Sequence, residues 1–191
     1  LLTSLLLILA LPAMAEPLGE AITQRLQQSD TLRGDFQQQK QLAMLPQPLK
    51  SNGQFLYSRQ HGLLWHTQAP LESRVLFTQQ GINHLDQPQS NPQGAAQQAA
   101  MRLFSQLFFA LVSADLAQLS DYFEIEGENL AEQWRLQLTP KPGDVARAIQ
   151  QLELRGDSQL QQVMFVDNNG DQTTIQFQNQ DASPLSSEEL Q

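Results

Sequence analysis

The spacing of hydrophobic and polar positions changes twice along this chain. After a short helical stripe near the start, apolar residues alternate with polar ones, then recur every three or four residues, and finally alternate again. Alternation is typical of a strand with one buried face, whereas a repeat of three to four is typical of a helix with one buried face. The pattern therefore predicts a helix, a run of strands, a helical insertion and a second run of strands.

The first part of the pattern predicts a helix over residues 17–29, where Leu18, Ile22 and Leu26 recur at steps of four and form one apolar stripe. Alternating segments then predict five strands. These strands are expected at residues 32–42, 51–58, 62–68, 72–80 and 82–86.

The helical insertion is predicted to begin at Asn91 and Pro92, since Asn is a favoured N-cap and Pro a favoured first helical residue. It continues over residues 93–112, and Ser113 is expected to cap a second short helix that reaches about Leu119. The apolar face of the insertion comprises Met101, Phe104, Leu107, Phe108 and Leu111, widened by Leu103, Phe109 and Val112. Such an apolar face ordinarily packs into the core of the protein. Because this helix interrupts a strand pattern, it also suits a lid over a hydrophobic pocket.

The last third of the chain returns to alternation. Trp134, Leu136 and Leu138 alternate with polar residues, which indicates a sheet with one wet face. Further strands are predicted at residues 151–155, 161–166 and 173–178, with residues 168–171 as a tight hairpin between the last two. The alternation slips between Ile149 and Leu152, which predicts a bulge or a late strand start there.

These elements predict one domain over residues 16–191. Ten or eleven antiparallel strands must curl, because open sheets of that size rarely stay flat. The expected fold is α+β: an antiparallel half-open β-barrel of about ten or eleven strands, with helices as a lid over a hydrophobic cavity.

Composition and charge exclude several classes of partner and of functional site. The chain is 40% hydrophobic and 16% charged, as soluble domains are, and Gln often stands where Lys or Glu is usual. The net charge of −9 argues against nucleic acid as a partner and against permanent residence on an anionic membrane. The absence of Cys excludes disulfides, thiolate metal sites, a cysteine nucleophile and lipidation of an N-terminal Cys.

Residues 1–15 have the apolar and cleavage regions of a signal peptide. Ala13 and Ala15 fit the small-x-small cleavage rule, so Glu16 is expected to begin the mature protein in the periplasm. The basic n-region is expected to be missing from the sequence. The alternative interpretation of this apolar stretch is a buried helix.

No constellation of residues indicates catalysis, a metal site or a cofactor. His61, His66 and His84 lack metal-ligand spacing, and no nucleophile elbow or glycine-rich phosphate loop is present. Glu124, Glu126 and Glu128 are expected on a solvated strand edge and turn. The acidic and amide residues at 167, 169 and 171 resemble part of a calcium loop, but Gly170 comes two residues too early and the twelfth position is Gln178 instead of Glu, so a hairpin turn is the better interpretation.

Several short motifs, in order, resemble the outer-membrane lipoprotein carriers of the LolA family. Phe36 with Gln37–Lys40 resembles an F-x-Q-K element, and Gly53-Gln54-Phe55 resembles the next strand. Leu64-Trp65 followed by Pro70 resembles the third, and residues 134–141 resemble a strand ending in L-x-P-K. The resemblance covers essentially the whole mature chain.

The resemblance implies a periplasmic, monomeric carrier that shields the acyl chains of lipoproteins and is not an enzyme. It implies an inner-membrane ABC transporter as donor and an outer-membrane receptor lipoprotein as acceptor. It places Arg59 as a latch that contacts the lid, although a solvated turn arginine is an equal alternative. It also implies a cavity and lid formed by Phe36, Phe55, Leu63, Trp65, Met101, Phe104, Leu107, Phe108 and Leu111.

Two positions depart from the family pattern. Gln60 stands where the family has Pro after the latch arginine, and Leu63 stands where it has an aromatic residue. These departures keep a second function open: a carrier of a different lipid or glycolipid that works with a separate inner-membrane exporter.

Overall fold

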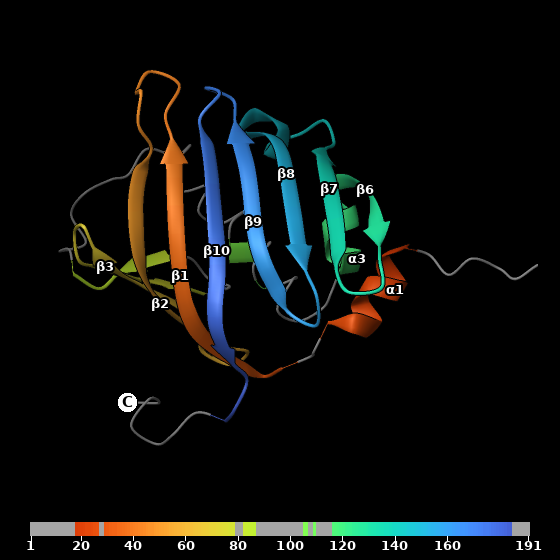
Figure 1. Cartoon of the computed structure of the whole chain (residues 1–191), viewed down its shortest axis with the longest axis horizontal. Helices are drawn as coiled ribbons and strands as arrows, with labels where there is room; N and C mark the ends of the chain where they lie inside the picture. The colour runs from red at the N-terminus through yellow and green to blue at the C-terminus, as the bar shows by residue number, and fades with distance from the viewer. Residues whose placement is uncertain are drawn as a thin grey trace, which may run out of the picture.

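The computed structural model describes residues 18–26, 29–78, 82–86, 105–106, 109 and 116–184. The expected signal peptide and the five residues of the lid face lie outside these ranges. Within them, the fold is a ten-stranded antiparallel sheet in the order β5-β4-β3-β2-β1-β10-β9-β8-β7-β6 (Figure 1). The predicted α+β open barrel is therefore confirmed.

The first half of the described chain supplies one helix and five strands. Their bounds are α1 Leu18–Arg25, β1 Thr31–Gln41, β2 Leu49–Ser58, β3 Gly62–Ala69, β4 Ser73–Phe77 and β5 Ile82–His84. The second half supplies a short helix, a 3-10 turn and five strands. Their bounds are α3 Leu116–Ser120, β6 Phe123–Asn129, β7 Trp134–Pro140, η1 Val145–Arg147, β8 Ile149–Gly156, β9 Leu160–Asp167 and β10 Gln172–Asp181.

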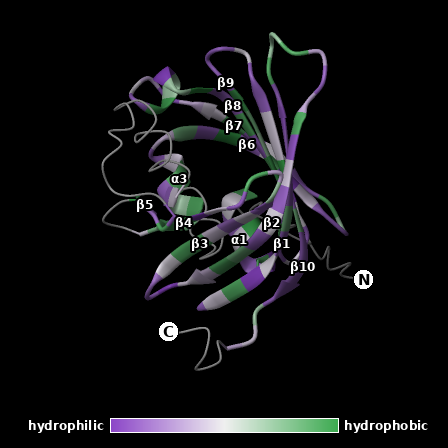
Figure 2. Ribbon diagram, turned by 90° about the vertical axis from the view of Figure 1, so that its left-hand side faces the viewer, coloured by the Kyte–Doolittle hydropathy of each residue, from purple (hydrophilic) through white to green (hydrophobic). Residues whose placement is uncertain are grey.

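Alternation along the strands decides which face is buried. In β7, Trp134, Leu136 and Leu138 are buried, whereas Arg135 and Gln137 between them are exposed. The buried residues share the concave side of the sheet with α1 and α3 (Figure 2). The sheet thus has an apolar inner face and a polar outer face, as the sequence predicts.

The irregularity predicted near Ile149 is present. The register between β8 and β9 shifts between Ile149 and Gln151, so one residue of β8 bulges out of the ladder. The predicted hairpin turn between β9 and β10 is also confirmed: Gly170 has a φ of +82° and its amide donates to the Asp167 carbonyl. Glycine suits this turn because a positive φ costs it little.

Three predicted elements are shorter in the structure. The helix expected at residues 17–29 ends at Arg25, and the strand expected at residues 72–80 spans Ser73–Phe77. The strand expected at residues 82–86 ends at His84, because the Asp86 side chain takes over at this edge. The Leu85 amide still donates to the Arg74 carbonyl, but the Arg74 amide and guanidinium donate to the Asp86 carboxylate, so the reciprocal ladder bond is not made.

The two runs of strands join through β1 and β10, which lie far apart in the sequence. Phe36 of β1 faces Phe177 of β10 in an antiparallel register that extends to Gln41 and Gln172. This pairing places residues from both ends of the chain on the same concave surface. Among the described residues, no helix has the length and apolar character needed to cross a membrane.

Candidate functional site

Four aromatic side chains from neighbouring strands meet on the concave face. We call Phe36 of β1, Phe55 of β2, Trp65 of β3 and Phe177 of β10 the aromatic wall. Each is at most 8% exposed. Because β3, β2, β1 and β10 are consecutive in the sheet, inward-facing residues at matched register positions come together.

The rings of the aromatic wall contact one another directly. Phe36 stacks on Trp65 with ring centroids 3.8 Å apart and an interplanar angle of 24°. Phe177 meets Phe55 and Trp65 edge-on, with centroid distances of 5.3 and 6.3 Å. Stacked and edge-to-face pairs are both favourable for aromatic rings. The result is a continuous apolar surface with no polar atom from these side chains except the indole N–H.

Two glycines opposite these rings allow the close packing. In the β1–β2 ladder, Gly53 pairs with Phe36 and Gly34 pairs with Phe55. A Cβ on Gly34 would lie 2.9 Å from Cε1 of Phe55, and one on Gly53 would lie 1.9 Å from the His66 carbonyl oxygen. Glycine at these positions therefore leaves room for the ring and for the β2–β3 bulge. This explains physically the Gly-x-aromatic motif seen in the sequence.

Leu63 and Tyr57 extend the aromatic wall toward the β2–β3 turn. They pair across the ladder and are 0% and 2% exposed. Burial raises the pKa of the Tyr57 phenol above its ordinary value, Arg59 opposes this shift and Asp30 adds to it. The shift moves the phenol further from ionisation, which suits an apolar surface.

The helical insertion reaches this surface at Phe109. Ser105, Gln106 and Phe109 are helical, and the Phe109 ring lies 5.6 Å from that of Tyr57. Phe109 is half-buried and packs against the core. The sequence placed Phe109 at the margin of the lid face. Met101, Phe104, Leu107, Phe108 and Leu111 lie outside the described residues, so their place in a lid stays a prediction.

Ser105 is buried on this helical segment. It is 3% exposed, and its hydroxyl has no hydrogen-bond partner among the residues that the structure describes. A buried hydroxyl without a partner is unfavourable.

The other half of the concave face is aliphatic. We call Leu136 and Leu138 of β7 with Leu152 and Leu154 of β8 the aliphatic wall; each is at most 1% exposed. Helices α1 and α3 lie over this half, behind β6 and β7 in Figure 1. Their buried residues share one core with the aliphatic wall, and these residues are Ile22, Leu116 and Leu119.

Arg25 fixes α1 to the sheet and was not singled out in the sequence. Its guanidinium donates to Oδ1 of Asn129 at 2.7 Å and to the carbonyls of Leu130 and Ala131 in the β6–β7 turn. An arginine at a helix end can satisfy several carbonyls at once, because its donors form a planar fork. Arg25 therefore ties the end of α1 to the β6–β7 turn.

Arg59 lies in the β2–β3 turn. Its Nε donates to Oδ1 of Asp30 at 2.6 Å, and its backbone amide donates to the Asp30 carbonyl at 2.9 Å. Its side chain is 50% exposed. This pair closes the start of β1 onto the turn, close to Tyr57. The latch role assigned to Arg59 involves residues outside the described ranges and stays a prediction.

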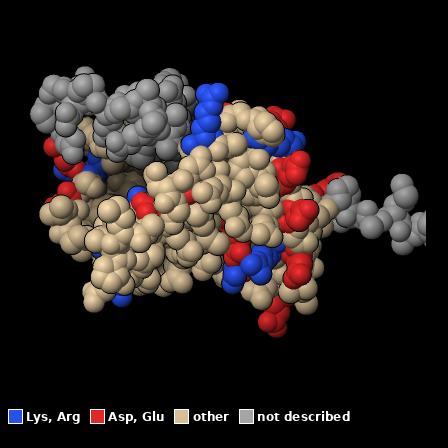
Figure 3. Space-filling view, turned by 90° about the horizontal axis from the view of Figure 1, so that it is seen from above, with Lys and Arg blue, Asp and Glu red and all other residues tan. Residues whose placement is uncertain are grey.

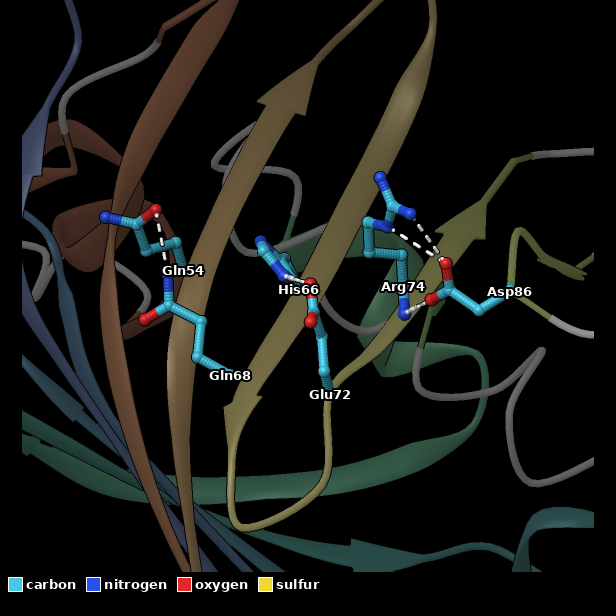
Figure 4. Close-up of polar contacts among 6 residues, drawn as sticks. All are labelled: Gln54, His66, Gln68, Glu72, Arg74 and Asp86. Atoms are coloured by element: carbon cyan, nitrogen blue, oxygen red, sulfur yellow. Dashed lines mark hydrogen bonds and ion pairs between the residues drawn. The ribbon is translucent and has the colours of Figure 1, made fainter.

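The outer face of the sheet is polar and pairs its groups locally. On β2 to β5, Gln68 donates to Gln54, His66 lies 3.1 Å from Glu72, and Arg74 holds Asp86 (Figure 4). Viewed from the end where the β1–β2 and β9–β10 hairpins project, charged side chains gather toward one side, and much of the remaining described surface is uncharged (Figure 3).

One buried carboxylate stands out on the outer face. Glu153 of β8 is 4% exposed and accepts hydrogen bonds from Arg135 at 2.5 Å and from Arg155 at 2.6 Å. Burial acts to raise its pKa, but the two arginines outweigh burial and hold the pKa below its ordinary value. This triad faces away from the aliphatic wall, so it supports the sheet and does not line the concave surface.

The prediction that three glutamates lie on a solvated edge is confirmed, and two of the histidines make local contacts. Glu124, Glu126 and Glu128 are exposed on the edge strand β6. His61 lies 3.1 Å from the Ser58 hydroxyl, while His66 contacts Glu72. Within the described ranges, no three His, Asp or Glu side chains converge on a point where a metal could bind.

Sequence reasoning found part of this site. Phe36, Phe55, Leu63 and Trp65 do come together on the concave face. It missed Tyr57 and Phe177, although both keep the two-residue phase of their strands with Phe55 and Ile175. This spacing of two residues was the signal in the sequence that could have identified Tyr57 and Phe177.

Comparison with protein families gives a match over most of the chain. The family model described as outer membrane lipoprotein carrier protein LolA matches residues 27–190. An outer-membrane lipoprotein carrier protein of Pseudomonas entomophila is 29% identical over 178 residues, which cover 93% of this chain and 84% of that protein.

Solved structures show more distant similarity. A LolA superfamily protein from Nitrosomonas europaea has a TM-score of 0.43 at 9% identity, covering 88% of this chain and 93% of its own. MucB in the Pseudomonas aeruginosa MucA/MucB complex has a TM-score of 0.49 at 14% identity, covering 91% of this chain and 60% of the other.

Proposed function

The chain belongs to the outer membrane lipoprotein carrier family, LolA, and we propose that it carries the acyl chains of lipoproteins across the periplasm. The proposed mature domain spans residues 16–191 after removal of a signal peptide at residues 1–15. In this proposal the carrier acts as a monomer. It needs no cofactor, because it binds and releases its cargo without changing a covalent bond.

The observation that carries this proposal is the aromatic wall on an open, curved sheet. Each methylene of an acyl chain gains about 0.8 kcal/mol on leaving water. A lipid anchor therefore needs a continuous apolar surface. Phe36, Phe55, Trp65 and Phe177 offer one, and their rings fill it when cargo is absent.

A carrier must also release its load, so part of the apolar interior must open. We propose that the lid is the helical insertion with Met101, Phe104, Leu107, Phe108 and Leu111, whose neighbour Phe109 packs near Tyr57. Cargo would enter by separating this helix from the aromatic wall. The helices over the aliphatic wall would stay, because Arg25 holds α1 to the β6–β7 turn.

Arg59 supports a latch in this scheme. Its side chain is half exposed and its Nε donates to Asp30, while a guanidinium carries four further N–H donors. We propose that these donors contact the lid in the closed form. The donor of cargo would be an inner-membrane ABC transporter, and the acceptor an outer-membrane receptor lipoprotein.

A second function, carriage of a different lipid or glycolipid with a separate exporter, is favoured by one buried position. Leu63 is 0% exposed beside Tyr57, where the resemblance predicts an aromatic residue. A branched aliphatic side chain there changes the shape of the inner surface. Such a change would favour cargo with a different acyl group or headgroup.

The test is release of newly made, triacylated lipoproteins from spheroplasts of the protein's own host. We expect the purified protein to release them into solution, and expect Arg59→Leu to reduce release while leaving the sheet folded. Arg147→Leu is the matched control, since Arg147 lies on η1 and pairs only with Asp144 among the described residues.

Absence of release, together with another lipid that co-purifies by mass spectrometry, would replace lipoprotein with that lipid as cargo. Normal release by Arg59→Leu would refute the latch. An empty protein that neither releases lipoprotein nor holds any lipid would refute the carrier proposal itself.

A further inference from the structure

The hairpin that joins β1 and β2 ends in exposed apolar residues. Met44 is 94% exposed, Leu49 is 52% exposed and Leu45 is 42% exposed. The hairpin projects at one end of the molecule, and its end is coloured hydrophobic in part (Figures 1 and 2). We call residues 42–49 the hairpin tip.

The strand registers explain why the hairpin tip stands clear of the sheet. On one side, the last residue of β1 that pairs with β10 is Gln41. On the other side, pairing of β2 with β3 begins only at Asn52. The residues between these two points therefore have no described strand beside them on the β3 side, and the tip extends past its neighbours.

Several backbone polar groups of the tip are paired within the protein. The Ala43 amide donates to Oδ1 of Asp171 at 2.9 Å, and the Leu45 amide donates to the Leu42 carbonyl at 3.0 Å. The Gln41 side chain donates to the carbonyls of Leu42 and Leu45, at 3.1 and 2.6 Å. Two further tip residues, Pro46 and Pro48, have no amide hydrogen. Each paired backbone group lowers the cost of moving the tip out of water into a less polar environment.

Basic residues flank the tip in an otherwise acidic protein. Lys40 and Lys50 lie at its base on opposite faces of the hairpin, because successive register positions alternate in direction. Lys40 lies 3.8 Å from Asp171, and Lys50 is exposed. The nearby carboxylates of Asp167 and Asp171 accept hydrogen bonds from backbone amides.

We propose that the hairpin tip makes transient contact with the surface of a phospholipid bilayer that contains anionic lipids. Met44 and Leu45 enter the headgroup region, and Lys50 contacts lipid phosphate. A projecting, convex point with shielded backbone suits a soft interface better than it suits the flat surface of a folded protein. The net charge of −9 repels the rest of the molecule from the bilayer, which keeps the contact brief. This inference concerns membrane contact and is independent of which cargo the concave face holds.

The experiment is vesicle flotation of the purified protein with protein-free vesicles of phosphatidylethanolamine and phosphatidylglycerol. We expect the protein to float with these vesicles, and expect Met44→Asp with Leu45→Asp to reduce its partition about tenfold or more. Lys50→Gln should reduce it about fivefold at low salt. Leu130→Asp is the control. Leu130 is 52% exposed, close to the 42% of Leu45, but it lies in the β6–β7 turn at the opposite end of the sheet.

A second variant, Met44→Trp, gives a direct optical readout. Its emission should shift to shorter wavelength on addition of the vesicles, whereas the protein without this substitution should shift little, since Trp65 and Trp134 are buried. Failure of the protein to float, or equal flotation of the tip variant and the Leu130→Asp control, would overturn the inference. Flotation that depends on the tip only when the vesicles contain membrane protein would also overturn the inference. That result would assign the tip to a protein partner.

Lipid binding in solution separates this inference from the proposed function. The tip variant should still bind a fluorescent fatty acid as the unmodified protein does. Loss of vesicle contact with normal fatty acid binding would support the bilayer role of the tip alone.

Discussion

The two halves of the concave face belong to one apolar core, but one half is built from aliphatic side chains and the other from aromatic rings. The aliphatic wall of β7 and β8 packs in one core with α1 and α3, and Arg25 ties α1 to the neighbouring turn. The aromatic wall of β1, β2, β3 and β10 is made of stacked and edge-on rings, and the described residue that reaches this side from the insertion is Phe109. From the proposed function, we expect the first half to serve as a permanent core and the second half to exchange its cover when cargo binds.

The difference has a chemical basis. Branched aliphatic side chains interlock closely with helices, and their removal leaves cavities. Flat rings can slide over one another and over an acyl chain with little loss of contact, because stacked and edge-on arrangements are similarly favourable. The contrast predicts that substitutions in the first half will mainly change folding stability, while those in the second will mainly change cargo binding.

The largest effect is expected at Trp134, beside the aliphatic wall. Its ring is 1% exposed, and its Nε1 donates to the Asp157 carbonyl at 2.7 Å. Trp134→Ala should lower the free energy of unfolding by about 3–5 kcal/mol, because it leaves a cavity and an unpaired carbonyl. Urea denaturation measures this. Trp134→Phe should retain fatty acid binding; loss of binding in that folded variant would contradict the division between the two halves.

A smaller loss of stability is expected at Trp65, with a larger effect on cargo. Trp65→Ala removes the stacking partner of Phe36 and should lower the free energy of unfolding by about 3 kcal/mol, the lower end of the range for a buried tryptophan. A fatty acid at 100 times its Kd should stabilise the unmodified protein by about 2.7 kcal/mol. This gain should fall sharply in Trp65→Ala and survive in Trp65→Phe. Equal ligand stabilisation in all three would show that the aromatic wall does not bind the acyl chain.

The smallest effect is expected at Glu153, on the outer face of the aliphatic half. Glu153→Gln should cost about 1–2 kcal/mol, since each arginine partner is about half exposed to solvent. The lowered pKa of Glu153 means that its contribution is present above its ordinary pKa and is lost as the pH falls through the folded value.

Denaturation curves at several pH values check this sign. Stability of the unmodified protein should fall as the pH drops below about 4, and part of that fall should be missing in Glu153→Gln. Fatty acid binding at neutral pH should be unchanged in this variant. An identical pH dependence in both proteins would mean that Glu153 has the same pKa in the folded and unfolded chain.

Much of the fold could be predicted from the spacing of apolar residues along the chain alone. The alternation at Trp134, Leu136 and Leu138 gave the correct face of β7, and the slip after Ile149 corresponds to an actual bulge. Helix and strand ends were less accurate. The α1 helix is shorter than its apolar stripe, and β5 ends where the Arg74 amide donates to the Asp86 side chain instead of to the ladder. Such endings depend on side chains from another strand, which a local pattern does not contain.

The candidate site was partly predictable for the same reason. Phe36, Phe55 and Trp65 belong to strands that are adjacent in the sequence, so their meeting follows from consecutive hairpins. Phe177 comes from the far end of the chain and joins them only because β10 pairs with β1. Arg25 likewise acts on a turn more than 100 residues away.

By itself, the sequence determined the order of elements, the apolar face of each strand and the family, because these depend on local spacing and on residues in a fixed order. The tertiary structure decided which strands from the two halves pair, which rings share the aromatic wall and where the hairpin tip projects. Those outcomes depend on the register between segments distant in the sequence and on the curvature of the whole sheet. No local pattern specifies them, because a contact between distant segments is fixed by all the other contacts that form with it.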